Sequence, residues 1–113
     1  MRKITKQSAN AFLNGVNFKS TNTQVIVVPS GSAFLELHGN TIAQRLNIEG
    51  IEDVIVINAC GWLTTTTKER LNALPNVSIN QKAGVWYLNG TKWDGSAVAV
   101  SPRHLPYYTT NKF

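Results

Sequence analysis

The segment from Gly61 to Arg70 combines hydroxyls and cations in a pattern that could hold phosphate. Four threonines, residues 64–67, precede Lys68, Glu69 and Arg70. Backbone amides at a helix start attract anions, and Thr, Lys and Arg side chains often contact the backbone of nucleic acids. The same residues also fit a capping box, in which the Thr66 hydroxyl accepts from the Glu69 amide and the Glu69 carboxylate accepts from the Thr66 amide. Capping alone accounts for the pattern, so a phosphate site here is a hypothesis.

Aromatic residues close to cations in the sequence form a second candidate. Single-stranded nucleic-acid binders combine stacking rings with positive charge, and Trp62, Trp86, Tyr87 and Trp93 could supply the rings. Trp86 and its neighbour Tyr87 face opposite sides of a strand, and the core is the favoured place for Trp86. The nucleic-acid-binding residues predicted from the sequence are Thr64, Thr65, Lys68, Arg70, Lys82, Lys92 and Trp93.

The polar and aromatic segment 101–113 is predicted to form a C-terminal tail. Tyrosine and arginine are common anchor residues in protein interfaces, so Arg103, Tyr107 and Tyr108 are candidates for docking on a partner protein. The alternative is that these side chains pack back onto the chain's own sheet.

The sequence offers few residues for catalysis or metal binding. His38, His104 and Cys60 have no paired spacing of the kind that metal sites use. Cys60 follows an apolar run and is expected to behave as a small buried residue rather than as a nucleophile. The adjacent Glu52 and Asp53 fit a solvated turn better than an acid–base pair. We therefore expect no enzyme activity, no cofactor and no metal.

Composition predicts one small, basic domain. The chain has 113 residues, of which 42% are hydrophobic and 15% charged, with a net charge of +5. Residues 1–20 carry four bases and no acid, residues 21–63 carry one base and four acids, and residues 64–113 carry six bases and two acids. Two basic ends would give one positive surface if they meet in space. Net charge also serves solubility, so it suggests nucleic acid without defining a site.

The sequence also favours a location inside the cell. The first residues lack the apolar run of a secretory signal, and one cysteine excludes an internal disulfide. The longest apolar runs are four residues long, too short for a membrane-spanning helix.

In the first half, apolar spacing predicts a helix that begins at Thr5, is capped by its hydroxyl, and ends at Gly15 in a left-handed conformation. Alternation predicts that Ala33, Leu35 and Leu37 lie on a buried face. The expected strands are 23–28, 33–38, 41–46 and 54–57.

In the second half, a helix is expected to begin at Thr66, to bury Leu71 and Leu74, and to end before Pro75. The expected strands are 77–82, 85–88 and 97–100. The predicted fold class is α+β: two short helices packed on antiparallel β-meanders, with residues 1–100 as a single domain. One interpretation is an internal helix-plus-meander duplication, although similar punctuation recurs in any small α+β fold.

Five short motifs in a fixed order carry a resemblance. They are Leu37-His38-Gly39-Asn40-Thr41-Ile42-Ala43, Gly61-Trp62, the run 66–72, the run 81–90 and Trp93-Asp94-Gly95. Together they resemble a family of small tailed-bacteriophage proteins of unknown function, over about residues 3–100. Cys60 and the tail from Ser101 depart from the family pattern. The resemblance implies a phage origin and carries over no site residues.

We therefore predict a noncatalytic phage accessory protein that binds nucleic acid through a basic face in the host bacterial cytoplasm. An alternative is an inhibitor that docks on a host or anti-phage defence protein, and another is a minor virion component. The expected partner is thus a nucleic acid or a host protein, with no role for a membrane.

Overall fold

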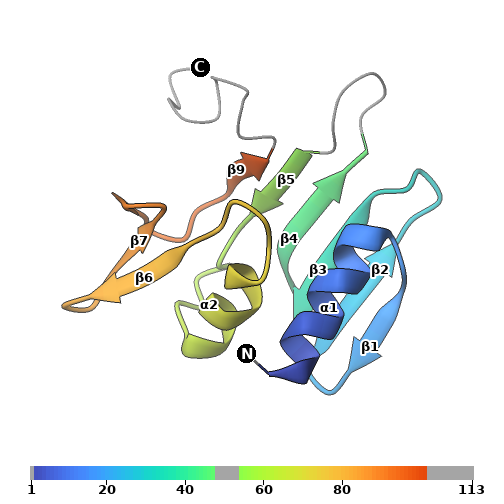
Figure 1. The fold of residues 1–113 in the computed structure, drawn as a ribbon, viewed down its shortest axis with the longest axis horizontal. Helices are drawn as coiled ribbons and strands as arrows, with labels where there is room; N and C mark the ends of the chain where they lie inside the picture. The colour runs from blue at the N-terminus through green and yellow to red at the C-terminus, as the bar shows by residue number, and fades with distance from the viewer. Residues whose placement is uncertain (1, 48–53, 102–113) are drawn as a thin grey trace.

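A computed structural model describes residues 2–47 and 54–101 of the chain (Figure 1). Two helices alternate with two sets of strands, each helix coming before its set. In chain order the elements are α1 Lys3–Asn14, β1 Phe18–Ser20, β2 Thr23–Val27, β3 Ala33–Leu37, β4 Asn40–Leu46, β5 Val54–Ile57, α2 Thr65–Asn72, β6 Ile79–Lys82, β7 Val85–Leu88, β8 Thr91–Lys92 and β9 Val98–Ser101.

The strands form two antiparallel sheets. The larger sheet has six strands in the order β1-β2-β3-β4-β5-β9, and the smaller has three in the order β6-β7-β8. β9 follows the small sheet in sequence but pairs with β5, so the chain returns to the large sheet at its end (Figure 1). This architecture confirms the predicted α+β class. The repeated order of helix and antiparallel strands is present, but the two sheets differ in size.

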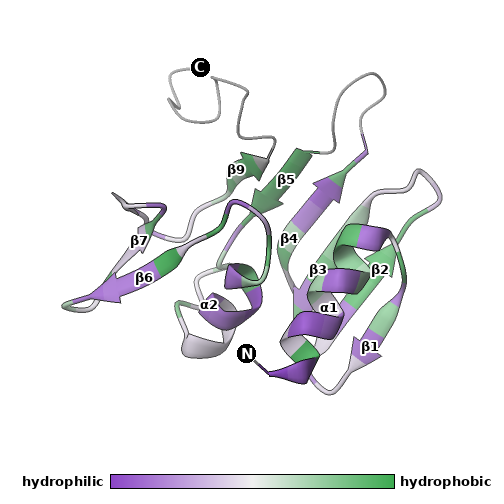
Figure 2. Cartoon of the chain, in the orientation of Figure 1, coloured by the Kyte–Doolittle hydropathy of each residue, from purple (hydrophilic) through white to green (hydrophobic). Residues whose placement is uncertain are grey.

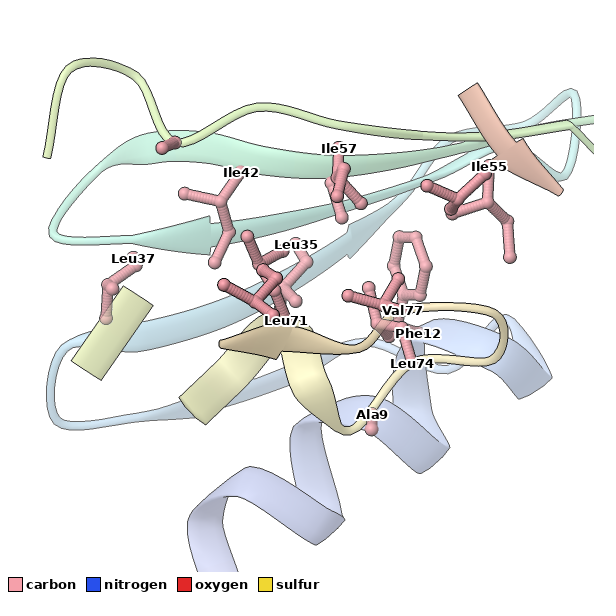
Figure 3. Packing of buried hydrophobic residues seen from close by; sticks show 14 of the residues in the cluster. Ala9, Phe12, Leu35, Leu37, Ile42, Ile55, Ile57, Leu71, Leu74 and Val77 are labelled. Carbon is pink, nitrogen blue, oxygen red and sulfur yellow. The ribbon is translucent and has the colours of Figure 1, made fainter. Parts of the chain in front are cut away.

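The hydrophobic core lies between the large sheet and the two helices, which cover the same face of that sheet (Figure 3). Ala33, Leu35 and Leu37 on β3 are all buried, as the alternation predicted, and Phe12 of α1 is fully buried in the same core. Figure 2 shows the complementary pattern: β5 and β9 are strongly hydrophobic, whereas much of α1 and β6 is polar.

α1 differs from its prediction at the start and agrees at the end. It begins at Lys3 after Arg2, whose side chain makes no capping bond, so Thr5 is not the cap. Thr5 is instead fully buried inside the first turn, where its hydroxyl accepts from Arg70. Gly15 ends the helix at φ 68°, as expected. Arg45 supports this end by donating from Nε to the Phe12 carbonyl at 2.9 Å.

The predicted capping box of α2 is wrong. Thr64 is the cap, and its hydroxyl accepts from the Thr67 amide at 3.2 Å. The cap thus lies two residues before the predicted Thr66, which places Glu69 beyond its reach. The Glu69 carboxylate binds Arg2 and Arg70 instead. The helix ends at Asn72, and the predicted burial of Leu71 and Leu74 is confirmed.

The small sheet is close to the prediction. β7 has the predicted bounds, whereas β6 begins only at Ile79 because Asn76 takes a positive φ of 63° and the Asn89 side chain accepts from the Ser78 amide. The short strands β1 and β8 were not anticipated. β9 runs one residue past its predicted end, to Ser101.

Several predictions fall on residues outside those described. The docking candidates Arg103, Tyr107 and Tyr108, the rest of the tail from residue 102, and the turn with Glu52 and Asp53 belong to this group. None of the helices in the described ranges is long and apolar enough to span a membrane.

Candidate nucleic-acid interface

The predicted nucleic-acid-binding residues separate into three places. Thr64, Thr65 and Lys68 lie on the first turns of α2, Arg70 and Trp93 are buried, and Lys82 and Lys92 lie on the two edge strands of the small sheet. The fold therefore does not bring the whole set into one site.

Arg70 is a structural residue, contrary to its predicted role. Its side chain is 1% exposed and donates from Nη1 to the Thr5 hydroxyl at 2.6 Å and from Nε to the Thr23 hydroxyl at 3.1 Å. Nη1 also lies 3.0 Å from a carboxylate oxygen of Glu69. Burial, together with the nearby Arg2 charge, lowers the pKa of Arg70. The guanidinium thus joins α2 to α1 and β2, and it is not available to a phosphate.

Trp93 is also unavailable as a stacking platform. It is 9% exposed, its indole nitrogen donates to the Ser96 carbonyl at 3.0 Å, and its ring centroid lies 6.3 Å from that of Trp86. Trp86 is itself buried, as predicted. These two rings form a small core that fixes the small sheet, and the prediction of Trp93 as a ligand contact does not agree with this burial.

Lys68 closes this small core from the side of α2. Its ammonium lies 5.7 Å from the centroid of the Trp86 ring and donates to the Gln81 side chain at 3.3 Å. A cation over an indole face is attracted by the ring's electrons. Lys68 therefore connects α2 to β6 and β7, and its charge is only half exposed to solvent.

The opposite face of the small sheet carries the two remaining predicted lysines. Tyr87 pairs directly with Lys92 on β8 and with Asn80 on β6, and Lys82 lies two residues beyond Asn80. Directly paired residues share a face and side chains alternate along each strand, so these groups point to the same side, away from Trp86. We call this surface, made of Asn80, Lys82, Val85, Tyr87 and Lys92, the outer basic face.

The outer basic face has an electropositive setting. Strands β6, β7 and β8 contain no acidic residue, and the first acid after them is Asp94, whose carboxylate accepts from the Ser96 amide at 2.9 Å. Hydrogen bonding to Ser96, through its side chain and its amide, lowers the pKa of Asp94. The whole chain has 11 Lys and Arg against 6 Asp and Glu, a net charge of +5. An anionic partner would therefore meet net positive charge at this surface.

A second candidate site is a pocket of about 410 Å³ between the β3–β4 turn and the start of α2. Leu37 and Ile42, at one end of the core layer in Figure 3, form part of its apolar lining. Its other lining residues include His38, Trp62, Thr64 and Thr66. We call it the Trp62 pocket, because this indole is 60% exposed and the other two tryptophans of the chain are buried.

In the sequence analysis, Trp62 is one of the rings that could stack on bases, but it is not among the predicted binding residues. No binding role is predicted there for His38. No local sequence signal marks the pocket, and the turn just before Trp62 is what places this side chain there. Cys60 and Gly61 take positive φ values of 55° and 78°, which carry the chain out of the sheet region. The Cys60 thiol donates to the Thr41 carbonyl at 3.0 Å, and burial raises the pKa of this thiol. Cys60 thus acts as an anchor for the turn.

The chain was compared with known proteins. A family described as Kyanoviridae Gp96 protein matches residues 1–110. The chain belongs to this family. Gp96 of the Kyanoviridae is a tailed-phage family, so the phage origin implied by the resemblance is confirmed. No curated protein and no solved structure matches the chain.

The match to the Gp96 family spans every helix and strand of the fold, and so includes both the outer basic face and the Trp62 pocket. Among the described residues of this Gp96-family chain, no group of three His, Cys, Asp or Glu side chains could hold a metal ion. What the two surfaces offer is binding chemistry: cations beside a tyrosine on one, and an exposed indole with hydroxyls and an imidazole on the other.

Proposed function

We propose that this phage protein binds single-stranded nucleic acid through the outer basic face, without catalysis, in the host cytoplasm. The observation that carries the proposal is that Tyr87 on the central strand shares one face with two lysines: Lys92, its direct partner on β8, and Lys82, two residues beyond its direct partner on β6.

The arrangement matches what a single strand needs. Neighbouring strands lie about 4.8 Å apart and residues rise about 3.4 Å along a strand. Lys92 therefore stands directly beside Tyr87, whereas Lys82 is one strand away on the other side and about 7 Å further along β6. Lysine ammonium groups contact phosphates, and an aromatic ring can stack on a base of any identity. Cations on both sides of a ring would let the backbone cross the sheet while one base rests on Tyr87.

The burial of the other candidates supports this assignment. Arg70, Trp93 and Lys68 are held in contacts within the protein, whereas Lys82 and Lys92 are exposed and have no acidic side chain on their own strands. Unpaired like charges on one face repel each other, and an anion bound between them would relieve that repulsion.

Fluorescence anisotropy with labelled DNA and RNA strands at several salt concentrations tests the proposal. Each phosphate neutralised by a lysine contributes about 0.7 to the slope of log affinity against log salt for single strands, so Lys82→Ala/Lys92→Ala should reduce the slope by about 1.4. Tyr87→Ala should weaken binding by about 5- to 150-fold, the range for one stacked base.

The matched control is Lys6→Ala/Lys19→Ala, which removes the same net charge from exposed positions on α1 and β1. This variant should retain most of the affinity and slope. Absence of binding at low salt, or an equal loss in the control variant, would overturn the proposed function.

A further inference from the structure

Among the described residues, Trp62 is the most exposed large apolar residue, at 60%. Its side chain is not part of the hydrophobic core. A single exposed apolar side chain is common, but an exposed indole that lines a pocket is informative about binding. The other two tryptophans are used in the Trp86–Trp93 contact, so Trp62 is the indole that a ligand could reach.

The backbone around Trp62 is held firmly. The Cys60 amide donates to the Asn58 side chain at 2.7 Å, the Trp62 amide donates to the Ala59 carbonyl, and the Thr64 amide donates to the Trp62 carbonyl, the last two at 2.9 Å. With the Cys60 thiol also bonded to β4, the turn is fixed on both sides of Trp62. The ring is therefore presented by an ordered segment, which limits the entropy lost when a ligand binds.

The rest of the pocket is mixed in chemistry. Leu37 and Ile42 provide an apolar surface, and His38, Asn40, Thr64 and Thr66 bring an imidazole, an amide and hydroxyls to the same space. The Thr64 hydroxyl already accepts from the Thr67 amide, and the His38 ring lies 3.4 Å from the Asn22 side chain. An apolar side chain from a partner would offer no hydrogen bond to the Asn40 amide or the Thr66 hydroxyl, at a cost in affinity. A nucleobase fits better, because it has flat faces for stacking and donors and acceptors along its edge.

The volume of the pocket and the net charge of the chain also favour a nucleotide as the ligand. A volume of about 410 Å³ lies in the range of pockets that enclose small molecules. The chain has 11 Lys and Arg against 6 Asp and Glu, a net charge of +5, which favours a ligand with phosphate groups over an uncharged or cationic one.

We infer that the Trp62 pocket binds one unpaired nucleobase, stacked on the Trp62 indole, from a single strand or from a free nucleotide. Where the base belongs to a strand, the inference rests on the proposed function and adds a second contact, away from the outer basic face. The protein would then recognise unpaired bases and not only the charge of the backbone.

The test compares a mixed-sequence single strand of about 12 nucleotides with an abasic strand of the same length, and adds the four 5′-mononucleotides as a separate arm. Wild type should bind the mixed strand more tightly than the abasic strand, and its tryptophan emission should be quenched. Trp62→Ala should weaken the mixed strand by about 5- to 150-fold and leave the abasic strand unchanged, because only base stacking is removed. Trp62→Phe should retain most of the affinity.

Val16→Ala serves as the control, since Val16 is 56% exposed and does not line the pocket. Far-UV circular dichroism checks that each variant is folded. If Trp62→Ala binds the mixed strand as wild type does, the inference is overturned while the proposed function stands. If strands fail to bind but mononucleotides quench emission in a Trp62-dependent way, the pocket is supported and the proposed function fails.

If no strand or mononucleotide binds, both fail. The pocket could instead be occupied by a second copy of this chain, and analytical sedimentation tests this. Self-association of wild type that is lost in Trp62→Ala would make the pocket an interface between copies and would overturn the inference.

Discussion

The molecule contains two units with the same order of elements and different tasks. In the first unit, α1 covers the six-stranded sheet and most of the apolar side chains are buried between them. In the second unit, α2 precedes a three-stranded sheet. The inner face of this sheet carries Trp86, which contacts Trp93, and its outer face displays Lys82, Tyr87 and Lys92. The larger sheet provides the core, and the smaller one provides surface.

The difference follows from the number of strands. A sheet of three short strands is stable only when it packs on a neighbour, so one face of the second unit is committed to α2. Lys68 serves this packing through Trp86, whereas Arg70 joins α2 to α1 and β2, although the sequence positions of both suggested ligand binding. Positive charge in this chain is thus divided between cations that hold the units together and cations that remain exposed.

The largest predicted effect concerns Arg70, which joins the two units. Arg70→Ala leaves the buried Thr5 and Thr23 hydroxyls without their donor and opens a cavity, so the free energy of unfolding should fall by about 3 kcal/mol. Urea unfolding of the variant and wild type measures this loss. Lys6→Ala, on an exposed position of α1, is the control and should change stability by less than about 0.5 kcal/mol.

The same experiment shows whether the units unfold together. All three tryptophans lie between residues 62 and 93, so their emission reports the second unit, whereas far-UV circular dichroism reports the whole chain. We expect the two transitions to coincide in wild type. Separate transitions would show that the units are independent, against the role given to Arg70.

A smaller loss is expected at Asn72, which ties the end of α2 to the small sheet. Its side chain donates to the Ile79 carbonyl at 3.1 Å and accepts from the Ile79 amide at 2.6 Å, as a neighbouring strand would. Asn72→Ala should lower the free energy of unfolding by about 1–2 kcal/mol, measured as a shift in the urea midpoint. Asn10→Ala, at an exposed site, is the comparison, and equal effects at the two sites would contradict the assignment.

Acid should weaken the link between α1 and α2. Hydrogen bonding to Arg2 lowers the pKa of Glu69 from about 4.5 to about 2. A carboxyl with a depressed pKa contributes stability above its unfolded pKa and loses it as the pH falls through the folded value, so this contribution should disappear between about pH 4.5 and pH 2. Because Arg2 is largely exposed and screened by solvent, the contribution should be small.

An NMR titration of the Glu69 carboxyl measures this pKa directly. Arg2→Ala should return it toward the ordinary range and flatten the pH dependence of stability in that window. An unchanged pKa in this variant would show that Arg2 is not its main cause.

The smallest effect on stability is expected on the outer basic face. Lys82→Ala and Lys92→Ala remove exposed side chains and should change the free energy of unfolding by no more than about 0.5 kcal/mol each. Thermal or urea unfolding checks this. A large loss would mean that these lysines are structural, as Arg70 is, and would remove the contrast between the two units.

Much of the fold could be predicted from local sequence patterns, because these patterns report burial directly. The alternation of Ala33, Leu35 and Leu37 placed β3, and the turn residues Ala83-Gly84 placed the hairpin of β6 and β7. The start of α2 is misplaced because four consecutive threonines offer several equivalent caps, and the local sequence does not distinguish Thr64 from Thr66.

The candidate site was harder to predict, since cations look alike in a sequence. Arg70 and Lys82 differ only in what the fold brings next to them, and the partners of Arg70 come from residues 5 and 23. The Trp62 pocket is likewise assembled from segments more than 20 residues apart, His38 and Trp62 among them. No local pattern carries that information.

The position of β9 has a consequence for how the protein is made. The ribosome must deliver the whole second unit before the last strand of the first sheet emerges, because β9 pairs with β5 across the intervening residues 58–97. Until then, one side of β5 has no partner for its backbone amides and carbonyls. A nascent chain stalled before residue 98 would therefore expose an open sheet edge, and prompt completion of translation protects it from pairing with other chains.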